Sequence, residues 1–168
     1  MTTPYSSRLR YVDATDVRQS PVSFDGLAVH NASDTKLGSV DGLIFDTTTG
    51  LLCYVVIDSG GWFRSRQYLL PVGHARLDVE GKVLRVDLEQ DTLKQYPEFN
   101  PDTFAALSDE DLRRFEQETV KACCPEDSAL GENPLVWGYE RWRHYRQPDW
   151  WQAPSQVETL KQPIPPSA

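Results

Sequence analysis

The sequence predicts a mainly β fold: a small antiparallel β-barrel, followed by a helical segment and an aromatic-rich C-terminal extension. Three observations support this class. Residues 22–88 contain five or six short apolar runs about ten residues apart, with glycine at the breaks, as small barrels do. Residues 89–124 change to a helical period. Residues 137–151 then contain six aromatic side chains.

Changes in composition divide the chain into four parts. Residues 1–19 hold little apolar material and predict a loose N-terminal arm. Residues 20–96 predict the barrel, and residues 97–124 predict the helical segment. Residues 125–168 form the extension, and its last part, 152–168, is rich in proline and typical of a disordered tail.

The barrel strands are expected at residues 24–30, 39–46, 51–58, 67–72, 74–79 and 82–88. Gly50 can take the positive φ that the turn before the third strand needs. Glu80 and Gly81 predict a two-residue turn between the last two strands. No glycine-rich phosphate loop and no alternation of strands with helices occurs, which argues against a nucleotide-binding α/β fold.

The helical segment has recognisable start signals. One helical turn is expected within 91–96, and Pro101 suits the first position of a helix. Ser108 and Asp111 form a capping box at the start of a longer helix. The apolar stripe of this helix recurs at helical spacing in Leu112, Phe115, Thr119 and Ala122.

The chain carries a formal charge of −8, and residues 78–127 account for all of it, with 14 acids and 6 bases. Such acidity argues against a partner that is duplex DNA, because its phosphates require clustered basic side chains. The longest wholly apolar run, 51–57, is far shorter than a membrane span. We therefore expect a cytoplasmic protein without a membrane span. Its thiols, Cys53, Cys123 and Cys124, are expected to be reduced.

Residues 24–88 resemble the PRC-barrel family, named after the cytoplasmic barrel of the photosynthetic reaction centre H subunit. The pieces that carry the resemblance are GLAV (26–29), KLGSV (36–40), IFD (44–46) with TG (49–50), YVVI (54–57) with GG (60–61), and YLLPV (68–72). The resemblance implies a small β-barrel that serves in assembly and docking, as in the reaction-centre subunit, a ribosome-maturation factor and many uncharacterised bacterial proteins. It implies no catalytic residues.

Catalytic, cofactor and metal sites are not expected. His30, His74 and His144 are scattered and form no metal-binding motif. No nucleophile-elbow sequence occurs. The three aspartates of the strand ends, Asp41, Asp46 and Asp58, are better explained by turn capping than by a common site.

Aromatic side chains are the candidate interaction surface. Trp62 and Phe63 follow a glycine pair and are followed by Arg64 and Arg66. The second group contains Trp137, Tyr139, Arg141, Trp142, Tyr145, Trp150 and Trp151. These rings could complete the protein's own core, because each buries a large apolar area. Both groups could also form an interface with another chain, where Trp, Tyr and Arg are enriched. The second group could instead stack on single-stranded nucleic acid.

The expected function is that of a non-enzymatic protein-interaction or assembly module. Its partner would be a protein or a second copy, so that the chain is expected to form a homo-oligomer. The first alternative is an RNA- or ribosome-associated binding protein, by analogy with the ribosome-maturation barrels. The second is an enzyme whose site follows no recognised motif.

Overall fold

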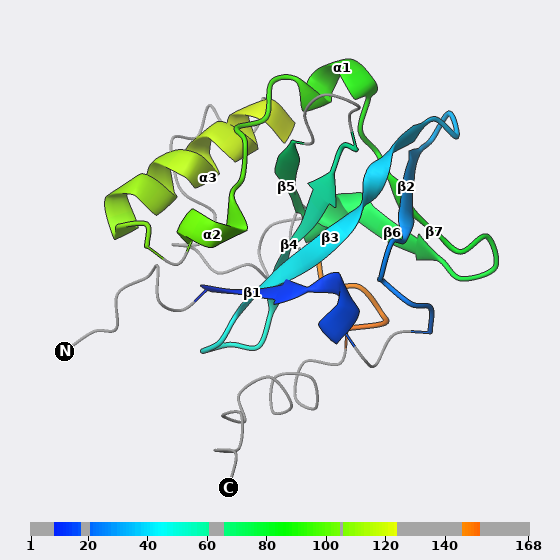
Figure 1. Cartoon of the computed structure of the whole chain (residues 1–168), viewed down its shortest axis with the longest axis horizontal. Helices are drawn as coiled ribbons and strands as arrows, with labels where there is room; N and C mark the ends of the chain where they lie inside the picture. Colours follow the sequence, from blue (N-terminus) through cyan, green and yellow to red (C-terminus); the bar gives the residue numbers. More distant parts are fainter. Residues whose placement is uncertain (1–8, 18–20, 61–65, 105, 124–145, 152–168) are drawn as a thin grey trace, which may run out of the picture.

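The computed structural model describes residues 9–17, 21–60, 66–104, 106–123 and 146–151 (Figure 1). The fold is mainly β, a seven-stranded mixed sheet followed by short helices. The strands are β1 (Leu9–Asp13), β2 (Ala28–Asn31), β3 (Lys36–Asp46), β4 (Leu52–Asp58), β5 (Gln67–Pro71), β6 (Ala75–Asp78) and β7 (Val83–Val86). The helices are α1 (Gln90–Leu93), α2 (Pro101–Phe104) and α3 (Asp109–Cys123), with 3₁₀ turns at Ala14–Asp16 and Val72–His74.

The strands follow the order β5-β4-β3-β2-β7-β6, and β1 also pairs with β3. The prediction of a purely antiparallel sheet is wrong at one place, because β2 and β7 are parallel. The β6–β7 hairpin returns to the free edge of β2 after the chain has formed β3, β4 and β5, and this long connection permits the parallel orientation. Pairings among the described residues leave β5 and β6 at the two ends of the sheet.

Residues 9–13, predicted to belong to a loose arm, form β1. This strand pairs with the second half of β3, and its Leu9 and Val12 are buried. Gly42 of β3 makes the approach possible, since a Cβ there would lie 2.4 Å from the Val12 carbonyl oxygen. The sequence of β1 is a weak strand signal by itself. Its pairing and packing against β3 stabilise the strand, because the local sequence pattern alone does not.

Both faces of the sheet are covered, and each carries a hydrophobic cluster. Leu43 and Phe45 of β3 belong to the inner cluster, whereas Ile44 between them belongs to the outer cluster. The inner cluster also contains Val29, Leu52, Val55, Ile57, Tyr68, Leu70, Leu84, Val86 and Leu93. The outer cluster also contains Leu9, Cys53, Tyr54, Val56, Leu69, Phe99, Phe104 and Leu112.

A bulge between β3 and β4 explains why β4 is apolar at consecutive positions. Phe45 pairs with Leu52, and Ile44 pairs with Tyr54, so Cys53 is an additional residue. Cys53 and Tyr54 therefore both belong to the outer cluster, while Leu52 belongs to the inner one.

Helix α3 covers the outer face beside β5 and β4 (Figure 1). Ser108 caps it as predicted: its hydroxyl oxygen accepts a hydrogen bond from the Asp111 amide at 3.1 Å. Glu116 of α3 is fully buried and accepts a hydrogen bond from the Tyr54 hydroxyl at 2.6 Å. A polar contact thus joins helix and sheet inside an otherwise apolar layer.

The turns differ in how closely they follow the sequence. Gly50 has the predicted positive φ of 77°, and Asp46 Oδ1 accepts a hydrogen bond from the Thr48 amide at 2.7 Å. The predicted two-residue turn at Glu80 and Gly81 is too short by one residue on each side. Val83 pairs with Asp78, which leaves a four-residue turn, 79–82. Within the described ranges, no helix has both the length and the apolar character that a membrane crossing requires.

Replacement of Gly38 by alanine tests the close approach of β3 and β4. Gly38 has a φ of +152°, and a Cβ there would lie 2.0 Å from the Asp58 carbonyl oxygen. We expect Gly38→Ala to lower the free energy of unfolding by more than about 3 kcal/mol, measured by chemical denaturation. Gly26→Ala is the control, because Gly26 also has a positive φ but open space around it. It should cost about 1–2 kcal/mol. Equal costs would contradict the proposed close approach.

The Tyr54–Glu116 contact can be tested by a double-mutant cycle. Tyr54→Phe removes the hydroxyl that donates to the buried Glu116, so we expect the free energy of unfolding to fall by about 1–3 kcal/mol. Adding Glu116→Leu should recover part of this loss, because no buried carboxylate is then left without its donor. If the effects of the two changes simply add, the pair does not stabilise the helix on the sheet.

Candidate interaction surface

Residues 146–151 lie across the inner side of the β3–β4 hairpin. The Gln147 side chain forms two hydrogen bonds with Leu52: its Oε1 accepts from the Leu52 amide at 2.8 Å, and its Nε2 donates to the Leu52 carbonyl at 2.7 Å. The Trp151 indole donates to the Gly50 carbonyl at 2.9 Å. Trp151 is buried in the inner cluster, with its ring 6.1 Å from that of Phe45. These contacts hold the segment in one position.

Trp150 packs beside the inner cluster but also faces a hollow. Its ring centre lies 4.8 Å from that of Phe24, which is fully buried. The hollow has a volume of about 470 Å³. Its lining residues come from three parts of the chain: Pro21, Ala75, Arg76, Leu77, Val79, Pro148, Asp149 and Trp150. Trp150 therefore forms one wall of an opening at the end of the sheet.

Strand β6 forms the opposite wall, and it is an open edge of the sheet, as is β1, which pairs only with β3 among the described residues. Among the described residues β6 pairs only with β7. The other end of the sheet, β5, is partly covered, since the Phe99 amide donates to the Gln67 carbonyl at 2.7 Å. An edge strand without a partner presents free amide and carbonyl groups to which another strand can bind.

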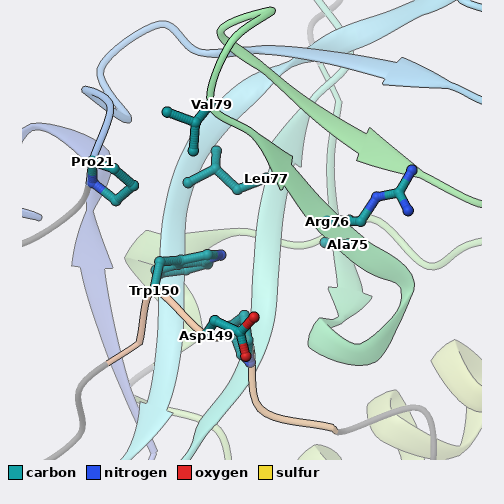
Figure 2. A pocket seen from close by; sticks show the side chains of 8 residues that line it. Pro21, Ala75, Arg76, Leu77, Val79, Asp149 and Trp150 are labelled. Carbon is teal, nitrogen blue, oxygen red and sulfur yellow. The ribbon is translucent and has the colours of Figure 1, made fainter.

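The side chains of β6 alternate between the hollow and the opposite face. In Figure 2, Leu77 and Val79 extend toward Pro21 and Trp150, whereas the Arg76 guanidinium points away from them. Val79 is 48% exposed, a high value for a large apolar side chain. The hollow thus has an apolar wall that reaches the surface.

The opposite face of the β6–β7 hairpin is charged. Arg85 of β7 binds Asp34 at 3.1 Å and Asp78 at 3.3 Å. The hydrogen bond from Arg85 lowers the pKa of Asp34, and the pKa of Asp78 is lowered first by the Gly81 amide and then by Arg85. Arg76 lies directly opposite Arg85 in the ladder and makes no ion pair with another described residue. Its charge contributes, after that of Arg85, to the lowered pKa of Asp78.

The structure describes only two residues of the predicted interaction surface. Trp150 and Trp151 lie in the described part of the chain, and both pack against the inner cluster. The others lie outside the described residues: Trp62, Phe63, Trp137, Tyr139, Arg141, Trp142 and Tyr145. Whether these residues pack against the rest of the chain or form an interface with another chain stays a prediction.

The histidines that are described each contact an aspartate. His30 Nδ1 lies 3.0 Å from Asp34, and His74 Nδ1 lies 2.7 Å from Asp87. His74 and Asp87 also line a second, smaller hollow of about 260 Å³ on the charged side of β6. His144 lies outside the described residues.

The three aspartates for which the sequence predicts turn capping lie in two turns and at a bulge. Asp46 caps its turn as described above, and Asp58 Oδ1 accepts a hydrogen bond from the Gly60 amide at 2.8 Å. Asp41 lies at the second bulge of β3 and accepts a hydrogen bond from the Tyr11 hydroxyl. Burial raises the pKa of Asp41, and this hydrogen bond opposes the rise. Turn capping, predicted for all three, thus holds for Asp46 and Asp58.

The apolar wall of the hollow is formed by Pro21, Leu77 and Val79. None of these residues is marked as a candidate by the sequence. The sequence did indicate that β6 and β7 form a hairpin. It carried no sign that β7 pairs with β2 and leaves β6 outermost. Val79 itself lies in the turn that follows β6, where it is exposed.

Comparison with known proteins agrees with this architecture. Residues 22–94 match the family described as PRC-barrel domain. A protein of Deinococcus radiodurans, described as an uncharacterized protein, is 35% identical over 77 residues. The match covers 46% of this chain and 28% of that protein. The chain therefore corresponds to less than a third of this relative.

Gln147→Glu tests how residues 146–151 are held. The change keeps the acceptor for the Leu52 amide but replaces the donor to the Leu52 carbonyl by a negative oxygen. We expect the free energy of unfolding to fall by about 1–3 kcal/mol in chemical denaturation. The control is Gln117→Glu, the same chemical change at an exposed position of α3, which should alter stability by less than about 0.5 kcal/mol. Similar effects at both positions would show that the Leu52 contact is unimportant.

Proposed function

Residues 22–94 of the chain are a PRC-barrel domain, and from this premise we propose that the protein is a non-enzymatic interaction and assembly module that associates with itself. The observation that carries the proposal is the open β6 edge beside a hollow with both apolar and polar lining. The edge offers unpaired backbone groups, and the hollow offers apolar area next to them. Together they have the composition of a protein-binding surface.

The rest of the sheet supports a docking role because it is already covered. Helix α3 packs on the outer face through the outer cluster, and residues 146–151 close part of the inner side. The β5 edge is bridged by Phe99. Among the described elements, β6 and β1 each have an unpaired edge, and β6 is the one that lies beside the hollow.

The curvature of the sheet supports a barrel-type module. Inward side chains of β2, β3, β4, β5 and β7 meet in one inner cluster. A sheet whose strands share one interior in this way is bent around it, as the wall of a barrel is. The β6 edge and Trp150 then lie at the opening of this wall (Figure 2).

A protein partner fits this surface better than a nucleic acid does. The walls of the hollow are formed by proline, aliphatic and tryptophan side chains, and arginine and aspartate are both present beside them. Surfaces that bind nucleic acid require an excess of basic groups. Equal numbers of opposite charges instead favour a protein surface of matching pattern.

Sedimentation equilibrium of the full chain tests the proposal. We expect a monomer–dimer equilibrium that shifts toward the dimer as concentration rises. Val79→Asp should weaken the dimer about tenfold or more, because it places a charge in the apolar contact. The variant should melt at nearly the wild-type temperature, since Val79 is 48% exposed.

Leu107→Asp provides a matched comparison at a partly buried apolar position of the outer cluster, away from β6. It should lower the melting temperature, while any folded fraction dimerises as the wild type does. A wild-type chain that stays monomeric up to millimolar concentration would overturn the proposal of self-association.

A further inference from the structure

We infer that two copies of the chain pair through β6 in an antiparallel register centred on Leu77. In this arrangement Leu77 lies opposite Leu77 of the second copy, and Arg76 lies opposite its Asp78. The two sheets then continue into each other across a two-fold axis. The inference rests on the proposed function and specifies which strand, which register and which side chains form the contact.

The hydrogen-bond pattern of β6 sets this register. The Asp87 amide donates to the His74 carbonyl at 3.3 Å, which makes these two residues a hydrogen-bonded pair. Such pairs alternate along an antiparallel ladder, so Arg76 and Asp78 direct their amides and carbonyls toward β7. Leu77 directs its own outward. Two Leu77 residues can therefore exchange both of their backbone hydrogen bonds.

The charges of β6 are self-complementary in the same register. Arg76 and Asp78 are separated by one residue and lie on one face of the strand. Around a Leu77–Leu77 centre, each Arg76 meets an Asp78, and the two ion pairs form symmetrically. They occupy a non-hydrogen-bonded position, where opposing side chains are closest. Arg76, which faces Arg85 across the ladder and is attracted by Asp78 of its own chain, gains a second carboxylate from the other copy.

The apolar side of β6 fits as well. One step further along the register, Val79 of one copy lies opposite Ala75 of the other. Ala75 lines the hollow next to Trp150. Opposed residues of paired strands point to the same face, so Val79 of the second copy points into the hollow. The exposed Val79 side chain can thus contact the apolar part of the hollow, formed by Pro21, Leu77 and Trp150.

The contact is small. Each copy supplies a strand of four residues and the rim of one hollow. Interfaces below about 1,200 Å² belong to weak or transient complexes. A dimer with a dissociation constant in the micromolar to millimolar range is therefore expected, and it should weaken as salt rises because the ion pairs are exposed.

A charge-swap experiment tests the register. The variant Arg76→Asp alone places Asp opposite Asp78, and Asp78→Arg alone places Arg opposite Arg76. Each variant should dimerise about tenfold or more weakly than the wild type. An equimolar mixture of the two should form a heterodimer nearly as stable as the wild-type dimer, because both positions then carry opposite charges. Sedimentation equilibrium with one variant fluorescently labelled measures all three.

The controls separate the inference from the proposed function. Arg113→Asp makes the same charge change on exposed α3 and should dimerise as the wild type does. If the wild type dimerises but the mixture remains monomeric, with both variants folded by thermal melting, self-association stands and the β6 register is wrong. If the single variants dimerise like the wild type, the same conclusion follows. A monomeric wild type overturns both.

Amide exchange in the unmodified chain gives a test that does not depend on the folding of Asp78→Arg, which also loses the contacts of Asp78 with Arg85 and Gly81. In the dimer the Leu77 amide becomes hydrogen-bonded. Its exchange, measured by NMR, should slow as protein concentration rises. The Arg76 and Asp78 amides, already bonded to β7, should change much less. Leu77 exchange that is independent of concentration in a sample that dimerises would exclude this register.

Discussion

The pairing of β3 with three other strands is the constraint on which the rest of the structure depends. Its first half pairs with β2 and its second half with β1, while β4 runs along the other edge. Gly38 and Gly42 permit these close approaches, and the bulge at Cys53 changes which face the following side chains of β4 occupy. Residues of β3 contribute to both hydrophobic clusters. Both faces of the sheet thus depend on the geometry of one strand.

The two faces are closed by different parts of the chain, and this division determines what remains open. Helix α3 covers the outer face and is held by apolar contacts together with the Tyr54–Glu116 hydrogen bond. Residues 146–151 close the inner side near the β3–β4 hairpin through Gln147 and Trp151. Neither covers β6. Among the described residues, the β6 edge, the exposed Val79 and the hollow thus stay uncovered.

Local sequence signals were reliable where the interaction that decides the structure is itself local. The Ser108 cap and the positive φ of Gly50 depend on a few neighbouring residues, and both are observed as predicted. The sequence did not predict β1 because the residues with which it pairs in β3 are 29 to 37 positions away. Trp151 illustrates the intermediate case: its aromatic character was evident, but its burial depends on a hydrogen bond to Gly50, about 100 positions earlier.

By itself, the sequence determined the class of fold, the family of residues 22–94, most strands and the start of α3, because these follow from side-chain periodicity, glycine placement and capping chemistry. Only the tertiary structure decided which strand lies at the edge. The parallel pairing of β2 with β7 places β6 outermost, and no periodic pattern encodes the neighbour of a strand. Because backbone groups are alike in every residue, an open edge can be recognised only when all its possible partners have been placed.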